Sequence, residues 1–172
     1  MKPMQRRVLV VDDDGGALYQ TYITSALTDA GYGSAVQATP VDAATLALYD
    51  AVVWLTGDDA TTSLTAAEQT ALAAYLEGGC GLILTGQNIA SDISGGTFLD
   101  EYLHAALASN NSSDISLSGL DVMAGLSLIL AGGTGANNQS SPDVITPLHG
   151  ATPESLRAQD AENYYLCRAN AL

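Results

Sequence analysis

The sequence predicts one α/β domain, residues 1–172, with helices on both faces of a mainly parallel sheet. The apolar runs at residues 8–11 and 51–56 are continuous rather than alternating, which is typical of strands buried on both faces. Segments with helical periodicity separate these runs, and this alternation of strand and helix indicates a parallel sheet. The length suits a single domain with a sizeable core.

The elements of the first half follow one another in order. The strand at residues 8–11 precedes a helix at residues 18–30, and further strands are expected at residues 34–38, 51–56 and 81–85. The apolar stripe of the first helix consists of Leu18, Tyr22, Ile23, Ala26, Leu27 and Ala30. Thr65 and Glu68 form a capping box that begins the next helix, and Gly78 and Gly79 end it.

The pattern is weaker in the second half. Residues 98–107 have the periodicity of a helix, residues 126–130 and 164–166 are expected strands, and residues 154–159 are an expected helical turn. Segments rich in Asn, Ser and Gly lie between them and predict surface loops. We therefore expect a flavodoxin-like three-layer αβα sandwich, with extra strands or a hairpin in the C-terminal half.

Charge excludes two classes of partner. The formal net charge is −14, and no Lys or Arg lies between residues 8 and 156. Nucleic acids and anionic membrane surfaces are bound through Lys and Arg, so neither is an expected partner. The sequence has neither a membrane-spanning apolar run nor the apolar core of a signal peptide. We therefore expect a soluble domain, either cytoplasmic or part of a larger secreted protein.

Polar side chains follow the predicted strands where each strand ends. They are Asp12, Asp13, Asp14, Asp58, Asp59, Gln87, Asn88 and Asp92. The carboxyl ends of parallel strands meet at one edge of a sheet, where ligands bind. Carboxylate and amide oxygens suit Ca²⁺ or Mg²⁺, whereas the simpler interpretation is that the aspartates cap helices and turns. Both interpretations stay open, and the metal is unknown.

The histidines and cysteines give weaker indications. His104 lies on the expected helix at residues 98–107, either as a structural hydrogen-bonding residue or as a ligand or base at the acidic edge. His149 is an expected loop residue, and the two histidines lack zinc-motif spacing. Cys80 and Cys167 are expected to be small buried residues, and they could form a disulfide only if their strands are neighbours.

A phosphoacceptor receiver domain also places acids after its first strand, but the comparison fails. Leu55 occupies the position of the receiver's phosphorylated aspartate. A receiver also needs a lysine on a late strand, and the single lysine of this chain is Lys2. A standard receiver is therefore excluded.

Five motifs in a fixed order resemble a known family. They occupy residues 8–14, 54–59, 64–79, 82–92 and 98–105. Together they resemble the class I glutamine amidotransferase-like, ThuA-related domain found as an accessory module in secreted multidomain bacterial proteins. The resemblance covers residues 7–108 and implies a flavodoxin-like fold, a secreted or cell-surface location as part of a larger protein, and no established activity. Residues 164–168 differ from the ending that relatives have.

In amidotransferases the turn after the fourth strand carries a cysteine nucleophile. Here the turn holds Gln87, while Cys80 lies too early and Ser91 has no histidine close in sequence. We therefore expect a non-catalytic module that binds a glycan, a peptide or a neighbouring domain. One alternative is a metal-assisted hydrolase with His104 as acid or base and Asp12, Asp14, Asp58 or Asp59 as ligands. The other is a purely structural packing module.

Overall fold

The computed structural model describes residues 7–110, 112, 116–129, 137, 140–157 and 160–168. The chain divides into two compact units, Met1–Gly86 and Gln87–Leu172. The first unit contains a parallel sheet with its helices, and the second contains an antiparallel sheet. The predicted α/β fold, with a parallel sheet and further strands in the C-terminal half, is confirmed.

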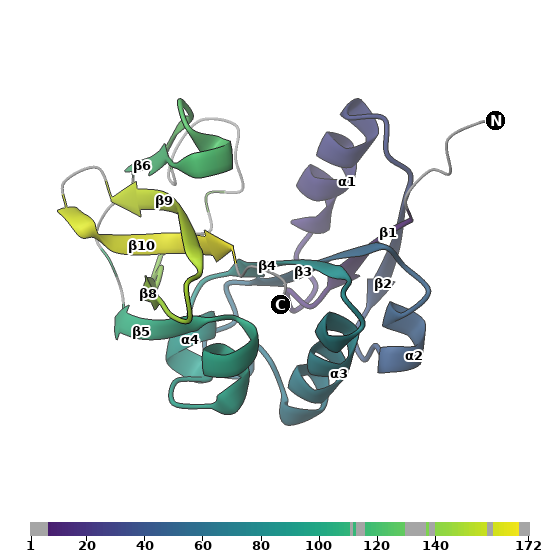
Figure 1. Ribbon diagram of the computed structural model, residues 1–172. Helices are drawn as coiled ribbons and strands as arrows, with labels where there is room; N and C mark the ends of the chain where they lie inside the picture. The colour runs from purple at the N-terminus through teal and green to yellow at the C-terminus, as the bar shows by residue number, and fades with distance from the viewer. Residues whose placement is uncertain are drawn as a thin grey trace. The chain divides into compact units, whose positions relative to one another are not determined.

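Four parallel strands form the sheet of the first unit, in the order β2-β1-β3-β4. Their bounds are Val8–Asp12 for β1, Ser34–Ala38 for β2, Ala51–Gly57 for β3 and Gly81–Gly86 for β4. The helices are α1 Gln20–Asp29, α2 Ala43–Leu46 and α3 Ala66–Glu77. Figure 1 shows α1 on one face of this sheet and α2 and α3 on the other. Sequence periodicity did not predict the short helix α2.

The core of the first unit lies around the central strands β1 and β3. On the α1 face, Ile23 and Leu27 pack against a cluster made of Val8, Val10, Val53 and Leu55. The alternate residues Leu9, Val11 and Trp54 are fully buried as well. Burial on both faces explains why the two strands are continuously apolar. The apolar stripe of α1 is narrower than predicted, because Leu18 is 70% exposed and Tyr22 is 49% exposed.

Two glycines allow a close approach at the carboxyl ends of the strands. A Cβ on Gly86 would lie 1.9 Å from Oγ1 of Thr56, so β4 can approach β3 there only without a side chain. Gly57 has φ +59°, and a Cβ on it would lie 2.8 Å from Cβ of Asp14. The strand ends therefore depend on glycine both for space and for backbone conformation.

The predicted capping box begins α3. The backbone N–H of Thr65 donates to Oε2 of Glu68 at 2.7 Å, and the N–H of Glu68 donates back to Oγ1 of Thr65 at 3.4 Å. Gly79, with φ +76°, follows the C-cap residue Gly78. Two N-terminal N–H groups of the helix end thus find acceptors, and the chain turns away where the sequence predicted.

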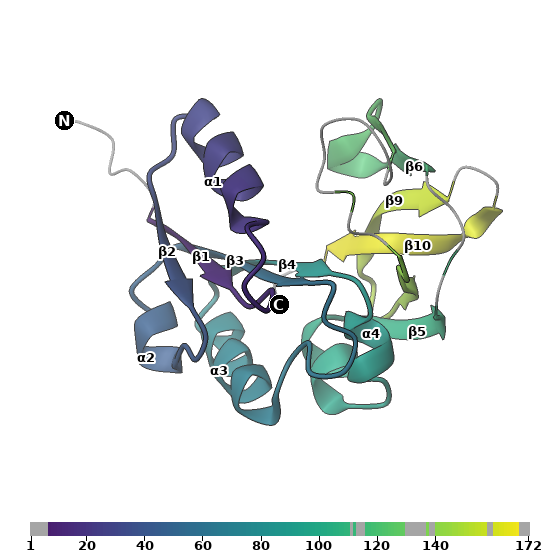
Figure 2. The same ribbon diagram turned by 180° about the vertical axis from the view of Figure 1, so that it is seen from behind.

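The second unit contains a six-stranded sheet in the order β5-β8-β10-β9-β6-β7 (Figure 2). Its strands are β5 Ala105–Ser109, β6 Ser116–Gly119, β7 Ser127–Ile129, β8 Val144–Pro147, β9 Thr152–Arg157 and β10 Asp160–Arg168. All neighbouring strands pair antiparallel. Three short helices complete the unit: α4 Ile89–Asp92, the π-helix η1 Phe98–Tyr102 and the 3-10 helix η2 Asp121–Met123.

Two elements of the second unit differ from the sequence prediction. The helix expected at residues 98–107 ends at Tyr102, and β5 begins at Ala105. His104 lies between them with φ +51°, which no helix residue adopts, and β5 pairs with β8. The helical turn expected at residues 154–159 is instead strand β9, which pairs with β10 and β6. In both segments, pairing with a strand distant in sequence overrides local propensity.

Within the described ranges, no helix has the length and apolar character needed to cross a membrane. Cys80 is a free thiol. The Cys167 side chain lies outside the described part, so the possible pairing of the two cysteines stays a prediction.

Candidate functional site

The acids predicted at the strand ends belong to the first unit, and most of them act as acceptors within it. Asp13 follows β1 and receives two hydrogen bonds, from Oγ1 of Thr39 at 2.9 Å and from Nε1 of Trp54 at 3.0 Å. Burial raises the pKa of Asp13, and the charges of Glu68 and Asp59 raise it further. The hydrogen bonds from Trp54 and Thr39 act in the opposite direction.

Asp14 holds the loop that leads into α1. It is 5% exposed, and its carboxylate accepts the N–H of Gly16 at 3.1 Å and the N–H of Tyr19 at 3.2 Å. The neighbouring Asp12 is partly buried. This burial, followed by a hydrogen bond and the negative charge of Asp14, raises the pKa of Asp12.

Asp59 and Asp58 follow β3 and differ in their surroundings. Asp59 accepts the N–H of Thr61 at 2.9 Å, and it also accepts the N–H and the hydroxyl of Thr62 at 3.1 and 2.7 Å. The bonds from Thr61 and Thr62 lower the pKa of Asp59. Asp58 is exposed. Among the described residues, no group of three His, Cys, Asp or Glu side chains is placed to hold a metal ion.

The remaining predicted site residues belong to the second unit, and Gln87 is the most deeply buried of them at 2% exposure. Its amide oxygen accepts the backbone N–H groups of Ser140 and Ser141 at 2.8 and 2.7 Å. The side chain at the expected nucleophile position is therefore held in the interior by a loop more than fifty residues away in sequence.

The left-handed residue of this turn is Asn88, with φ 62° and ψ 7°. It is 5% exposed and precedes the first residue of α4. In a nucleophile elbow, a sharp strained turn exposes the reactive side chain. Here the strained position carries an amide side chain that is itself buried. Neither Gln87 nor Asn88 has a nucleophilic atom.

The same loop supports α4 in return. The N–H of Ser91 donates to Oδ2 of Asp143 at 2.8 Å, and Oγ of Ser91 donates to the carbonyl of Asn88 at 3.0 Å. Oδ1 of Asp143 is buried, with no hydrogen-bond partner among the described groups. Asp92 ends α4 and is half-buried. Sequence reasoning missed Asp143, because its segment carries only the composition of a surface loop.

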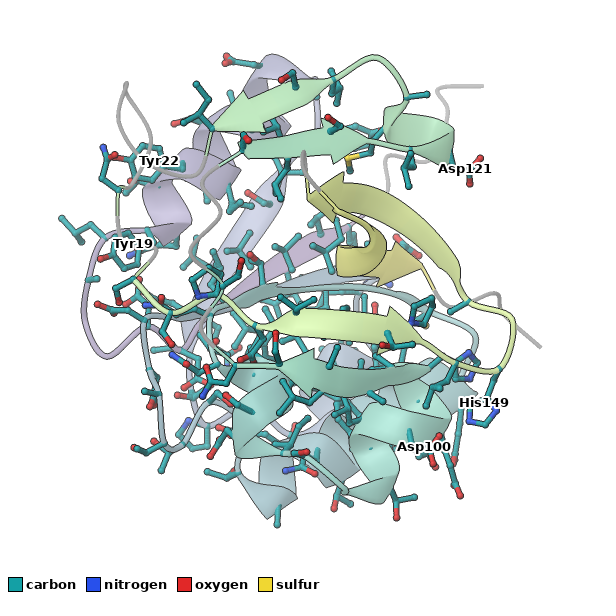
Figure 3. The ribbon with its side chains drawn as sticks, turned by 90° about the vertical axis from the view of Figure 1, so that its left-hand side faces the viewer. Tyr19, Tyr22, Asp100, Asp121 and His149 are labelled. Carbon is teal, nitrogen blue, oxygen red and sulfur yellow. The ribbon has the colours of Figure 1, made fainter. Side chains whose placement is uncertain are left out.

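His104 lies in the turn between η1 and β5 rather than on a helix. Its ring lies edge-to-face with that of His149, with 5.5 Å between the ring centroids. Nε2 of His149 lies 2.5 Å from Oδ1 of Asp100, and Figure 3 shows these two labelled side chains next to each other. Sequence reasoning missed Asp100 and assigned His149 only to a loop, because the three positions meet only through the pairing of β5 with β8.

The parallel sheet and the strand-to-helix turn that follows it define a flavodoxin-like α/β class with an amidotransferase-like fold. A solved structure from Thermoplasma acidophilum, of a protein provisionally described as the first subunit of a GMP synthase, is similar to this chain with a TM-score of 0.52. The alignment covers 90% of this chain and 74% of that one, at 14% sequence identity, so the likeness concerns the fold alone. No protein-family model and no curated protein matches the sequence.

Proposed function

We propose that this chain is a non-catalytic binding or interaction module on an amidotransferase-like scaffold. The observation that carries the proposal is the state of Gln87. Its side chain takes the position where a nucleophile would have to stand, it is 2% exposed, and two backbone N–H groups bind its oxygen. A turn closed in this way presents no group that could attack a carbonyl or a glycosidic carbon.

The binding surface in this proposal is the carboxyl end of the parallel sheet in the first unit. Asp58 is exposed there and Asp12 is partly exposed, so carboxylate oxygens can accept hydrogen bonds from a ligand. A net charge of −14 disfavours phosphate-bearing ligands. Amines and hydroxyls suit these acceptors, which favours a peptide or a glycan.

A neighbouring domain is a further partner of the same kind. Large apolar side chains of the first unit are exposed, among them Leu48 at 56% and Ile83 at 58%. Apolar side chains of this size gain most when another protein surface covers them. A location in a larger secreted protein agrees with such a partner and stays a prediction. The metal-assisted hydrolase has less support, because Asp13, Asp14 and Asp59 already serve as internal acceptors.

The absence of catalysis can be tested with a panel of amide, ester and glycoside substrates. The wild-type chain is compared with an Asp58→Asn, Gln87→Ala double variant and with Asp58→Asn alone. We expect all three proteins to hydrolyse every substrate at the rate of the buffer. Turnover by the wild type that the double variant loses would refute the proposal.

Binding can be tested with arrays of immobilised glycans and peptides. We expect the wild type to retain a subset of ligands that Asp12→Asn and Asp58→Asn bind more weakly. Asp29→Asn, which changes an exposed acid at the end of α1, is the matched control. Equal binding by all variants would show that the carboxyl end of the sheet is not the binding surface.

A further inference from the structure

The two histidines of the chain come together in the second unit. The rings of His104 and His149 are 5.5 Å apart, with their planes at 74°. Both residues have φ +51°, a left-handed conformation that non-glycine residues adopt rarely and only where other interactions support it. The N–H of Leu148 donates to the carbonyl of His104 at 2.7 Å and connects the two backbone segments.

Asp100 determines which nitrogen of His149 carries a proton. An ionised carboxylate only accepts hydrogen bonds, so Nε2 of His149, 2.5 Å from Oδ1 of Asp100, is the protonated nitrogen. In the neutral ring this leaves Nδ1 with a free lone pair. Metal-binding histidines are commonly oriented in this way, with the second ring nitrogen donating to a carboxylate.

His104 has a nitrogen that lacks a partner. Its Nδ1 atom is buried and has no hydrogen-bond partner among the described groups. A buried polar atom without a partner lowers stability, and an ion bound to that atom would offset the loss. In contrast, the side chains of His149 and Asp100 are 54% and 56% exposed, so an ion from solvent can reach them.

The separation of the rings decides whether one ion could join them. With metal–nitrogen bonds of about 2 Å, the centroids of two imidazoles on one ion lie about 5 Å apart. The observed 5.5 Å differs from this by less than a small side-chain rotation provides. A site with two protein ligands also agrees with the finding that no three ligand-type side chains of the described residues form a metal site.

We propose that His104 and His149 bind one first-row transition-metal ion, with Asp100 as the positioning residue for His149. Water, or a group from a bound partner, fills the remaining coordination positions. Imidazole nitrogens favour Cu²⁺, Ni²⁺ and Zn²⁺, with Cu²⁺ bound most tightly, whereas Ca²⁺ and Mg²⁺ require oxygen ligands. The site is formed entirely by the second unit and is independent of the turn that carries Gln87.

Calorimetric titration of the full chain tests the site. We expect one Cu²⁺, Ni²⁺ or Zn²⁺ ion per chain, at least tenfold weaker binding in His104→Gln and in His149→Gln, and a smaller loss in Asp100→Asn. Two controls should bind like the wild type: Asp121→Asn, which changes an exposed acid of the same unit, and the Cys80→Ser, Cys167→Ser double variant. Equal affinity in both histidine variants, or a wild type without such binding, would overturn the proposal.

A second measurement needs no variant and so does not depend on how well a variant folds. The chain has two histidines, so its imidazole NMR signals form two sets. We expect substoichiometric paramagnetic Cu²⁺ to broaden both sets together, and Mg²⁺ to broaden neither. Broadening of a single imidazole, or of none, would refute a shared ion.

Discussion

At the scale of single residues, Gln87 holds the loop at Ser140 and Ser141. Gln87→Met keeps a similar side-chain size but removes the acceptor, which leaves two backbone N–H groups without their partner. We expect the free energy of unfolding to fall by about 2 kcal/mol or more, as measured by urea denaturation. Gln37→Met, at a half-buried glutamine of β2, is the matched control and should cost less. Equal losses at the two positions would contradict this role of Gln87.

Asp59 has a pH dependence whose sign follows from its hydrogen bonds. Its pKa is lowered below the ordinary value of 3.8, so its carboxylate stabilises the folded chain above that pH. This contribution is lost as the pH falls through the folded-state pKa. Asp12 and Asp13, whose pKa values are raised, act in the opposite direction, so only a difference between variants isolates Asp59.

We therefore expect Asp59→Asn to lower the free energy of unfolding near neutral pH, by less than about 1 kcal/mol because the site is largely solvated. The difference from the wild type should shrink as the pH falls below the ordinary value of 3.8. Chemical denaturation at a series of pH values measures it. A difference that grows toward acid would mean that the sign is wrong.

At the scale of elements, the approach of β4 to β3 depends on Gly86. Gly86→Ala would place a methyl group 1.9 Å from Oγ1 of Thr56, and we expect the free energy of unfolding to fall by about 1 to 3 kcal/mol. Thr56→Ala removes that oxygen, which is buried and has no hydrogen-bond partner among the described residues. In the double variant the nearest atom would be Cβ of residue 56 at 3.2 Å.

A double-mutant cycle measures this coupling. We expect the double variant to lose clearly less stability than the sum of the two single variants. Thr85→Ala, at an exposed position of β4, serves as the control partner for Gly86→Ala and should give additive losses. Additivity with Thr56→Ala as well would show that the strand ends relax without this contact.

At the scale of the whole molecule, a net charge of −14 makes self-repulsion a general term in stability. Added salt screens this repulsion, so the melting temperature should rise with ionic strength. At matched ionic strength we expect Ca²⁺, Mg²⁺ and Na⁺ to act alike in calorimetric melting. A rise specific to Ca²⁺ or Mg²⁺, abolished by Asp13→Asn, would contradict this and establish a cation site among the acids.

Sequence patterns were reliable where the structure is local. The continuous apolar runs of β1 and β3 and the capping box of Thr65 and Glu68 depend on neighbours a few residues away, and each lies where it was predicted. The same is true of the absence of a nucleophile after β4, since the residue types are visible directly. These features determine the fold class and exclude one chemistry.

Only the tertiary structure decided the rest. The segment after Tyr102 has helical periodicity, but strand β8, some forty residues away, pairs with it as β5 and turns His104 out of any helix. The same pairing brings His149 to His104, and a distant loop closes over Gln87. The sequence alone determines the parallel α/β scaffold and the missing nucleophile, because both depend on local residue types. The partners of Gln87 and His104 depend on contacts between segments far apart in the chain, which no local pattern encodes.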